Sequence, residues 1–176
     1  QGIEVRCAKD GQLDPERPDE AMIGRALEVA AETGVEFACL TPYYRDFVTP
    51  EKRPGELEGM RRTADLAARL RCPLVRAYGG VLPPQGLSHA ETWERTVSGL
   101  REAADYAGER GVGLVIETHG GTLTLTAAQA AAMARDVDRL NVGILFDYVW
   151  VYLAGEEPLD QAVALCAPWI RHAHVK

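Results

Sequence analysis

The stretch Val112–Gly121, VGLVIETHGG, joins an apolar run to a carboxylate, an imidazole and two glycines. Successive side chains of a β-strand point to opposite faces, so Glu117 shares a face with Val115 while Leu114 and Ile116 share the other. A strand that is apolar on both faces is typical of a buried parallel sheet, where an unpaired carboxylate is costly. Glu117 therefore needs partners.

Two later predicted strands end in groups that are able to partner Glu117. Asp147 closes the stretch NVGILFD, and His174 lies near the end of the stretch RHAHVK. Carboxylate oxygens and an imidazole nitrogen at the C-terminal ends of three successive strands form a ligand set suited to a divalent metal ion. We interpret Glu117, Asp147 and His174 as metal ligands. The alternative is three unrelated polar strand ends, with Glu117 paired to an arginine.

The chemistry expected of such a site is proton transfer next to a carbonyl. A divalent ion polarises a bound carbonyl and stabilises the enediolate that forms when a proton leaves the neighbouring carbon. Glu117 is the candidate general base, because its carboxylate adjoins both metal and substrate. His119, two residues further on, is a second catalytic candidate that contacts substrate or orients Glu117; the alternative is an ordinary loop histidine.

Other polar and aromatic residues near strand ends are candidates for substrate binding. An arginine suits a phosphate or hydroxyl group, although an inward ion pair such as Arg76 with Glu4 is an equal alternative. His172 alternates with His174 and supports the site or contacts substrate, and aromatic residues wall the pocket or simply pack. The predicted substrate-binding residues are Arg6, Arg76, Tyr43, Trp150, His172 and Lys176.

The elements that must position these residues alternate strictly between strand and helix. Strands are expected over 3–7, 35–40, 74–78, 112–117, 141–147 and 171–176. Between them, helices are expected over about 19–33, 57–70, 89–110, 127–137 and 159–166, two of them opened by capping boxes, Ser88 with Glu91 and Thr126 with Gln129. This order predicts a parallel sheet with right-handed crossovers.

A parallel sheet of this kind is either an open doubly wound sheet or a barrel. No GxGxxG turn follows a strand, whereas polar groups lie at almost every strand end, as at the C-terminal face of a (β/α)₈ TIM barrel. A complete barrel needs about 250 residues, so we expect residues 1–176 to form one partial barrel domain with about two βα units missing. The chain is thus expected to be a fragment, and its exposed strand edges leave a homo-oligomer open as one way of covering them.

Composition narrows the class further. The formal net charge of −7 works against a nucleic-acid partner, and no basic run reverses it locally. The four cysteines lack CxxC spacing, which fits a reducing compartment. No apolar run has membrane length and no signal peptide is recognisable. These features predict a cytoplasmic protein with a small-molecule substrate.

The runs IETHGG, NVGILFD, AGEEP and RHAHVK, with GIEVR and PLVRAYGG before them, resemble the sugar phosphate isomerase/epimerase family. These xylose-isomerase-like barrels include endonuclease IV (the AP endonuclease family 2 type), inosose dehydratase and ketohexose 3-epimerases. The resemblance runs from the family's second strand to its seventh. Its most specific part is the ordered trio of Glu, Asp and His-x-His at strand ends.

The resemblance implies that Glu117, Asp147 and His174 match three of four metal ligands, the fourth being a Glu on an eighth strand that this chain lacks. It also implies Mn²⁺, with Mg²⁺, Co²⁺ or Zn²⁺ as alternatives. The multi-metal endonuclease form needs a His where this chain has Trp150, so DNA repair is disfavoured. Thr118 stands where the epimerases usually have Asn.

We therefore expect a metal-dependent isomerase or epimerase of carbohydrate metabolism that acts on a small sugar, sugar phosphate or keto acid. Two alternatives stay open. One is a lyase of the inosose or 3-dehydroshikimate dehydratase kind, which removes the same proton and then expels water. The other is a non-catalytic binding module or an inert piece of a barrel. The short chain alone is expected to bind metal weakly and to turn over little.

Overall fold

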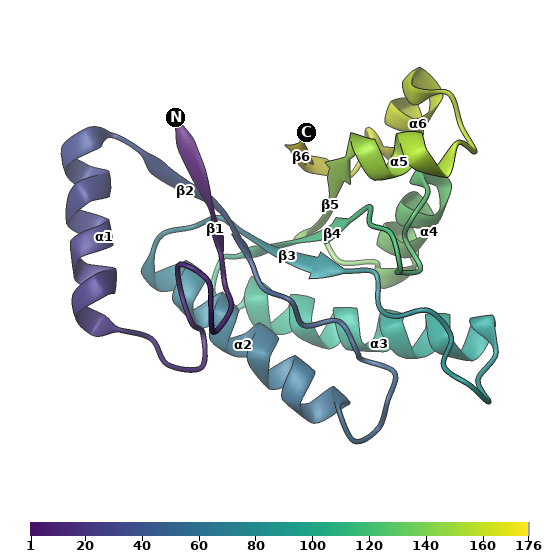
Figure 1. The fold of residues 1–176 in the computed structure, drawn as a ribbon, viewed down its shortest axis with the longest axis horizontal. Coiled ribbons are helices and arrows are strands. Elements are labelled where there is room, and N and C mark those ends of the chain that lie inside the picture. Colours follow the sequence, from purple (N-terminus) through teal and green to yellow (C-terminus); the bar gives the residue numbers. More distant parts are fainter. Residues whose placement is uncertain (176) are drawn as a thin grey trace.

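A computed structural model describes residues 1–175 as one curved sheet of parallel strands flanked by helices (Figure 1). The strands lie in the sheet in the order in which they occur in the chain. They are β1 (Gly2–Arg6), β2 (Glu36–Thr41), β3 (Leu74–Tyr78), β4 (Gly113–Glu117), β5 (Val142–Asp147) and β6 (Ile170–His174). The helices are α1 (Glu20–Thr33), α2 (Arg53–Arg69), α3 (His89–Gly108), α4 (Ala127–Val137), α5 (Tyr148–Ala154) and α6 (Leu159–Cys166).

This arrangement confirms the predicted partial (β/α)₈ barrel. Helices α1 to α4 follow the outside of the curved sheet, α6 packs against α4, and α5 contacts α6 (Figure 1). Strands β1 and β6 are the two edges of the six-stranded sheet within residues 1–175. A sheet that curves this far without closing is half of a barrel, and its concave side corresponds to the barrel interior.

Local signals in the sequence account for where the helices begin. The side chain of Asp19 accepts hydrogen bonds from the backbone at the start of α1. Both predicted capping boxes are present: Ser88 with Glu91 opens α3, and Thr126 with Gln129 opens α4. Each box satisfies backbone N–H groups that have no partner within the helix.

The core separates into an outer and an inner layer because strand side chains alternate between the two faces of the sheet. The inner layer is small and consists of Cys39, Val115 and Leu145, with Leu74 packed against it. The outer layer fills the space between the sheet and the helices, and its largest buried members include Leu40, Met60, Leu100, Leu114, Ile116 and Met133. The packed sheet thus holds in place the polar side chains that point inward at the ends of the strands.

Two elements differ clearly from the expectations. Helix α5 was not predicted; it begins directly after Asp147, whose side chain accepts a hydrogen bond from the backbone N–H of Val149. Strand β6 covers Ile170–His174 rather than 171–176, and the predicted substrate residue Lys176 lies outside the described residues. None of the helices within residues 1–175 combines the length and the apolar composition required to cross a membrane.

Candidate metal and active site

Glu117, Asp147 and His174 meet at the C-terminal ends of three neighbouring strands. Asp147 on β5 lies directly opposite His174 on β6 in the strand register, and β4 brings Glu117 alongside. Nδ1 of His174 is 3.0 Å from a carboxylate oxygen of Glu117 and 3.4 Å from one of Asp147. Both carboxylates are fully buried, with residue exposures of 1% and 0%. The predicted trio is therefore a single cluster.

The donor set and the spacing of this trio fit a divalent metal ion. Its three potential ligand atoms all lie within 4.8 Å of one another. Ligand atoms at the usual ~2.1 Å from a shared ion are about 3 to 3.5 Å apart, which matches the two distances from His174. Two buried carboxylates so close together also require positive charge between them, because like charges in a dry site repel. A divalent cation would supply it.

Arg76 supplies part of that charge. Its Nη1 atom donates to the second carboxylate oxygen of Glu117 at 3.1 Å, and both side chains are buried. Its Nη2 atom donates to the backbone carbonyl of Pro42. The alternative pairing of Arg76 with Glu4 was wrong: Arg76 on β3 pairs with Glu117 on the neighbouring strand β4, whereas the carboxylate of Glu4 contacts His172 and His174.

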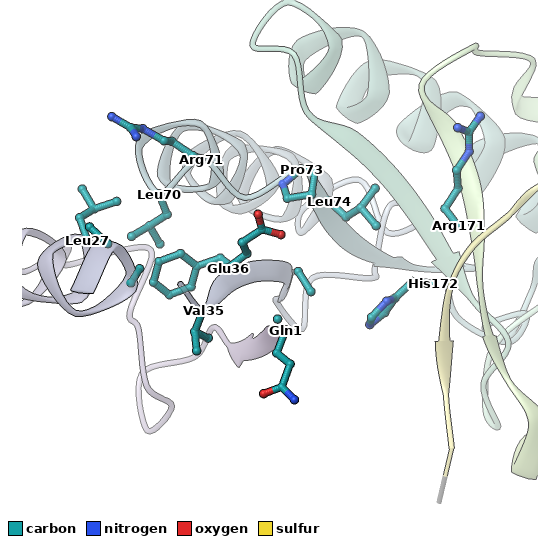
Figure 2. Close-up of a pocket in the computed structure, with 15 residues that line it drawn as sticks. Gln1, Leu27, Val35, Glu36, Leu70, Arg71, Pro73, Leu74, Arg171 and His172 are labelled. Atoms are coloured by element: carbon teal, nitrogen blue, oxygen red, sulfur yellow. The ribbon is translucent and has the colours of Figure 1, made fainter. Parts of the chain in front are cut away.

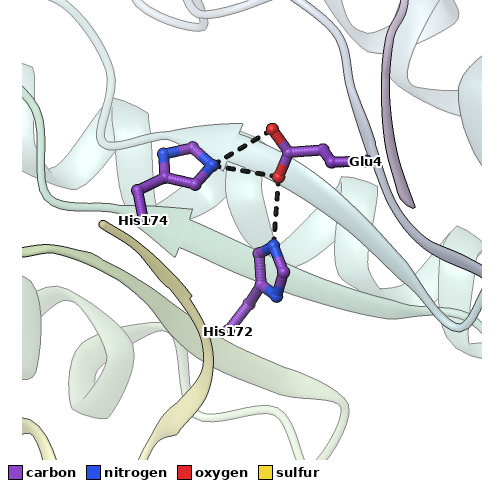
Figure 3. A group of neighbouring side chains, drawn as sticks. All are labelled: Glu4, His172 and His174. Carbon is purple, nitrogen blue, oxygen red and sulfur yellow. Dashed lines mark hydrogen bonds and ion pairs between the residues drawn. The ribbon is translucent and has the colours of Figure 1, made fainter. Parts of the chain in front are cut away.

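Glu4 instead joins the two histidines of β6. One of its oxygens is 3.1 Å from Nε2 of His172 and 2.9 Å from Nε2 of His174, as Figure 3 shows. Burial tends to raise the pKa of Glu4, but the hydrogen bonds from the two histidines lower it to about 2. Hydrogen bonds to Glu117 and then to Glu4 raise the pKa of His174 to about 10, against the effect of burial. Both contacts thus favour the protonated, positively charged form of His174.

A threonine-rich loop after β4 fixes the backbone at Glu117 and Asp147, where β4 and β5 end. The hydroxyl of Thr118 accepts from the backbone N–H of Asp147 at 2.8 Å and donates to the carbonyl of the same residue at 3.2 Å. Thr124 donates to the carbonyl of Glu117 at 2.8 Å. Sequence reasoning treated Thr118 only as a departure from the family and did not single out Thr124. The repeated threonines in GTLTLT were the available signal.

Aromatic rings border the cluster. Tyr78 packs against His119 with ring centroids 5.0 Å apart, and His119 against Trp150 at 4.8 Å. The guanidinium of Arg76 lies 4.3 Å from the ring centre of Tyr78 and 4.8 Å from that of Tyr43. The predicted residues Tyr43, His119 and Trp150 thus lie around the same space. Tyr78 was not predicted, although it ends β3 as Glu117 ends β4.

The remaining candidates are placed less centrally. Arg6 is partly exposed. Its guanidinium forms an ion pair with Asp10 at 2.8 Å and donates a hydrogen bond to the hydroxyl of Tyr43 at 3.1 Å. His172 is half-buried and contacts Glu4. Tyr44, the neighbour of Tyr43, packs against the core, where its ring occupies the space that a side chain at Gly59 would need.

A cavity that none of Glu117, Asp147 and His174 lines lies on the other side of His172, which forms part of its wall. It has a volume of about 800 Å³ and is bounded by the beginnings of strands rather than their ends, including Gln1, Glu36, Leu74 and Arg171 (Figure 2). Ligands of βα barrels bind at the C-terminal ends of the strands. The cavity thus corresponds to the opposite end of the half-barrel, and we do not assign the chemistry to it.

Comparisons with known proteins agree with the fold. A family model described as "Xylose isomerase-like TIM barrel" matches residues 1–176. A 3-dehydroshikimate dehydratase of Bacillus anthracis is 28% identical over 120 residues, which are 68% of this chain and 42% of that protein. An inosose dehydratase of Bacillus thuringiensis is 33% identical over 86 residues, 49% of this chain and 28% of that protein. The matched part is thus less than half of either relative.

Solved structures match over nearly the whole chain at low identity. A probable 3-dehydroshikimate dehydratase of Bacillus anthracis has a TM-score of 0.83 at 20% identity, covering 98% of this chain and 61% of that one. An L-ribulose 3-epimerase has a TM-score of 0.81 at 23% identity, covering 99% and 59%. A barrel from Mycobacterium smegmatis in complex with magnesium has a TM-score of 0.77 at 19% identity, covering 100% and 61%.

Proposed function

Because the chain belongs to the xylose isomerase-like TIM barrel family, we propose that it is a divalent-metal-dependent isomerase or epimerase. Its substrate is a small sugar, sugar phosphate or keto acid, from which it removes a proton next to a carbonyl. The observation that carries this proposal is the convergence of Glu117, Asp147 and His174 on one buried point.

These three residues would hold the ion, with Mn²⁺ the first choice and Mg²⁺, Co²⁺ or Zn²⁺ the alternatives. When bound, such an ion polarises the substrate carbonyl and stabilises negative charge that develops on its oxygen. Arg76 keeps the carboxylate plane of Glu117 fixed through its contact at 3.1 Å. Thr118 keeps the backbone of Asp147 in register with the end of β4.

Glu117 is the proposed general base. Its carboxylate accepts a proton from the substrate carbon next to the carbonyl, and an enediolate results. Return of a proton to the neighbouring carbon completes an isomerisation, and return to the opposite face of the same carbon completes an epimerisation. His119, held between Tyr78 and Trp150, is the proposed contact to substrate oxygens. Neither reaction changes the mass of the substrate.

Arg6, Tyr43 and Lys176 remain proposed contacts to the more distant substrate oxygens or a phosphate. Arg6 and Tyr43 are already joined by a hydrogen bond, so they would act as one unit. Such contacts hold the substrate in the orientation in which it reacts, and they take no part in making or breaking bonds.

A second candidate is a dehydratase, and it is favoured by the names of the relatives that match in sequence. The first step is the same removal of a proton. The enediolate then expels the hydroxyl on the next carbon, which leaves as water after it gains a proton from an acid. The product is lighter than the substrate by one water.

The two candidates are separated by mass spectrometry in D₂O. The protein is incubated with Mn²⁺ and a panel of ketohexoses, inosose and 3-dehydroshikimate. An isomerase or epimerase incorporates deuterium without loss of water, a dehydratase releases water, and Glu117→Gln abolishes either result. A protein that binds metal yet produces neither result would contradict both candidates and favour a binding module.

A further inference from the structure

Glu4 is the carboxylate that reaches the candidate site from the opposite edge of the sheet. It lies on β1, 170 residues before His174 on β6, and the two meet across the open side of the half-barrel (Figure 3). The carboxylate oxygens of Glu4 are 2.9 and 3.1 Å from Nε2 of His174. The same ring presents Nδ1 to Glu117 at 3.0 Å.

The two nitrogens of an imidazole are chemically distinct when one of them binds a metal ion. The nitrogen that binds has no proton, and the other carries one and donates it to a neighbour. An ionised carboxylate only accepts hydrogen bonds. The contact with Glu4 therefore requires a proton on Nε2 of His174 and leaves Nδ1 as the nitrogen that is able to bind an ion.

We propose that Glu4 is a positioning residue that fixes the tautomer and the orientation of His174, so that Nδ1 faces Glu117 and Asp147. This inference rests on the metal site in the proposed function. Glu4 touches neither the substrate nor the ion. Without it the ring of His174 is free to turn and to present either nitrogen.

His172 completes the arrangement by holding Glu4. Its Nε2 atom lies 3.1 Å from the carboxylate oxygen of Glu4 that also contacts His174. The side chain of Glu4 is 30% exposed, so solvent competes for it, and a second donor restricts its rotation. A connected series of hydrogen bonds then runs from His172 through Glu4 to His174. Of the two roles expected for His172, support of the site and contact with substrate, the arrangement favours the first.

A competing arrangement is a second ion bound by Glu4, His172 and His174, whose potential ligand atoms also lie within 4.8 Å of one another. That ion would require Nε2 of His174 as a ligand while Nδ1 binds the first ion. The ring would then have to lose both protons. The positioning role requires the loss of only one, and for that reason we favour it.

The test combines metal titration with histidine NMR on the full chain. Zn²⁺ is titrated into protein labelled with ¹⁵N in its four histidines. We expect a single bound ion, with His174 coordinated through Nδ1 and protonated at Nε2. Glu4→Leu is expected to weaken Zn²⁺ binding about 10- to 100-fold, the usual effect of removing such a partner. Glu4→Gln, whose side-chain oxygen still accepts a hydrogen bond, is expected to retain more affinity than Glu4→Leu.

Glu36→Leu is the matched control, because Glu36 is an exposed glutamate on β2 opposite Gly2. The affinity of the Glu36→Leu protein for Zn²⁺ is expected to equal that of the wild type. Circular dichroism of each variant establishes that it is folded. Unchanged affinity in folded Glu4→Leu, coordination through Nε2, or two ions per chain would overturn the inference. If instead His174→Ala and Glu117→Gln leave Zn²⁺ binding unchanged, the metal site of the proposed function is itself wrong.

Discussion

Arg76 is the residue that makes a buried Glu117 tolerable before any ion is bound. The side chains of the pair are only 7% and 2% exposed, so water screens neither charge. In such surroundings a carboxylate without a partner is expensive, because its hydration is lost and nothing replaces it. From the sequence, an ion pair of Glu117 with an arginine was the alternative to a metal site. The structure has this ion pair and the cluster of potential metal ligands at the same time.

Arg76→Met is expected to destabilise the metal-free protein by about 3–5 kcal/mol, the usual cost of removing one partner of a buried ion pair. Urea unfolding in the presence of a chelator measures the change. Arg25→Met serves as control, because the exposed pair of Arg25 with Glu28 contributes at most about 1 kcal/mol. Equal losses from Arg76→Met and Arg25→Met would mean that Arg76 does not compensate a buried charge.

At the scale of elements, α5 is the part that reasoning from the sequence missed. Its stretch YVWVYLA is short and apolar and contains two β-branched valines, so neither a helical nor a strand period stands out. Asp147 has two roles that the sequence does not separate. It ends β5 with its side chain in the ligand cluster, and it also accepts the hydrogen bond that opens α5.

Helix α5 places Trp150 over Gly120 in the loop after β4. A Cβ atom at Gly120 would lie 2.4 Å from the ring of Trp150, closer than such atoms approach. Gly120→Ala is therefore expected to displace Trp150 and to cost about 1–3 kcal/mol, with a shift in tryptophan fluorescence. Unchanged stability and fluorescence would contradict this placement of α5.

Gly24→Ala is the matched control for that substitution. Gly24 lies within α1, and nothing is within 4 Å of the position that its Cβ would occupy. The substitution is expected to stabilise the protein by about 0.5–1 kcal/mol, because alanine is the better helix former. Thermal unfolding compares the two variants directly.

The sequence predicted the elements far better than the contacts between distant ones. Strand and helix positions follow from local periodicity and capping residues, and the Glu117, Asp147 and His174 cluster follows from the rule that parallel strands end on the same side. The contact of Glu4 with His174 depends on how far the sheet curves. No local pattern encodes that curvature, so Glu4 was considered only as a partner for Arg76.

At the scale of the whole molecule, the four cysteines are buried and free. Burial raises the pKa of the Cys7 thiol to about 12 and those of Cys72 and Cys166 to about 11, and it also raises the pKa of Cys39. In the unfolded chain a thiol ionises near pH 8.5. The unfolded state therefore loses these protons first as the pH rises, and the folded state is progressively disfavoured above about pH 8.5.

Cys7→Ala removes one of these contributions. Between pH 8 and pH 10 the free energy of unfolding of the variant is expected to fall by about 2 kcal/mol less than that of the wild type. Urea titrations at both pH values, under reducing conditions, provide the comparison. Parallel losses in the two proteins would show that Cys7 ionises in the folded state as readily as in the unfolded one.

The central claim is that one buried cluster at the ends of β4, β5 and β6 holds a divalent ion, and metal content tests it most directly. Elemental analysis of protein purified without chelator is carried out on the wild type, Glu117→Gln and His174→Ala, with the exposed His89→Ala as control. The account predicts that the wild type and His89→Ala take up one divalent ion per chain when Mn²⁺ is added, in line with weak binding by the short chain, and that the other two variants take up none. A wild-type protein that is empty and takes up no added Mn²⁺, or variants at Glu117 and His174 that keep their metal, would contradict it.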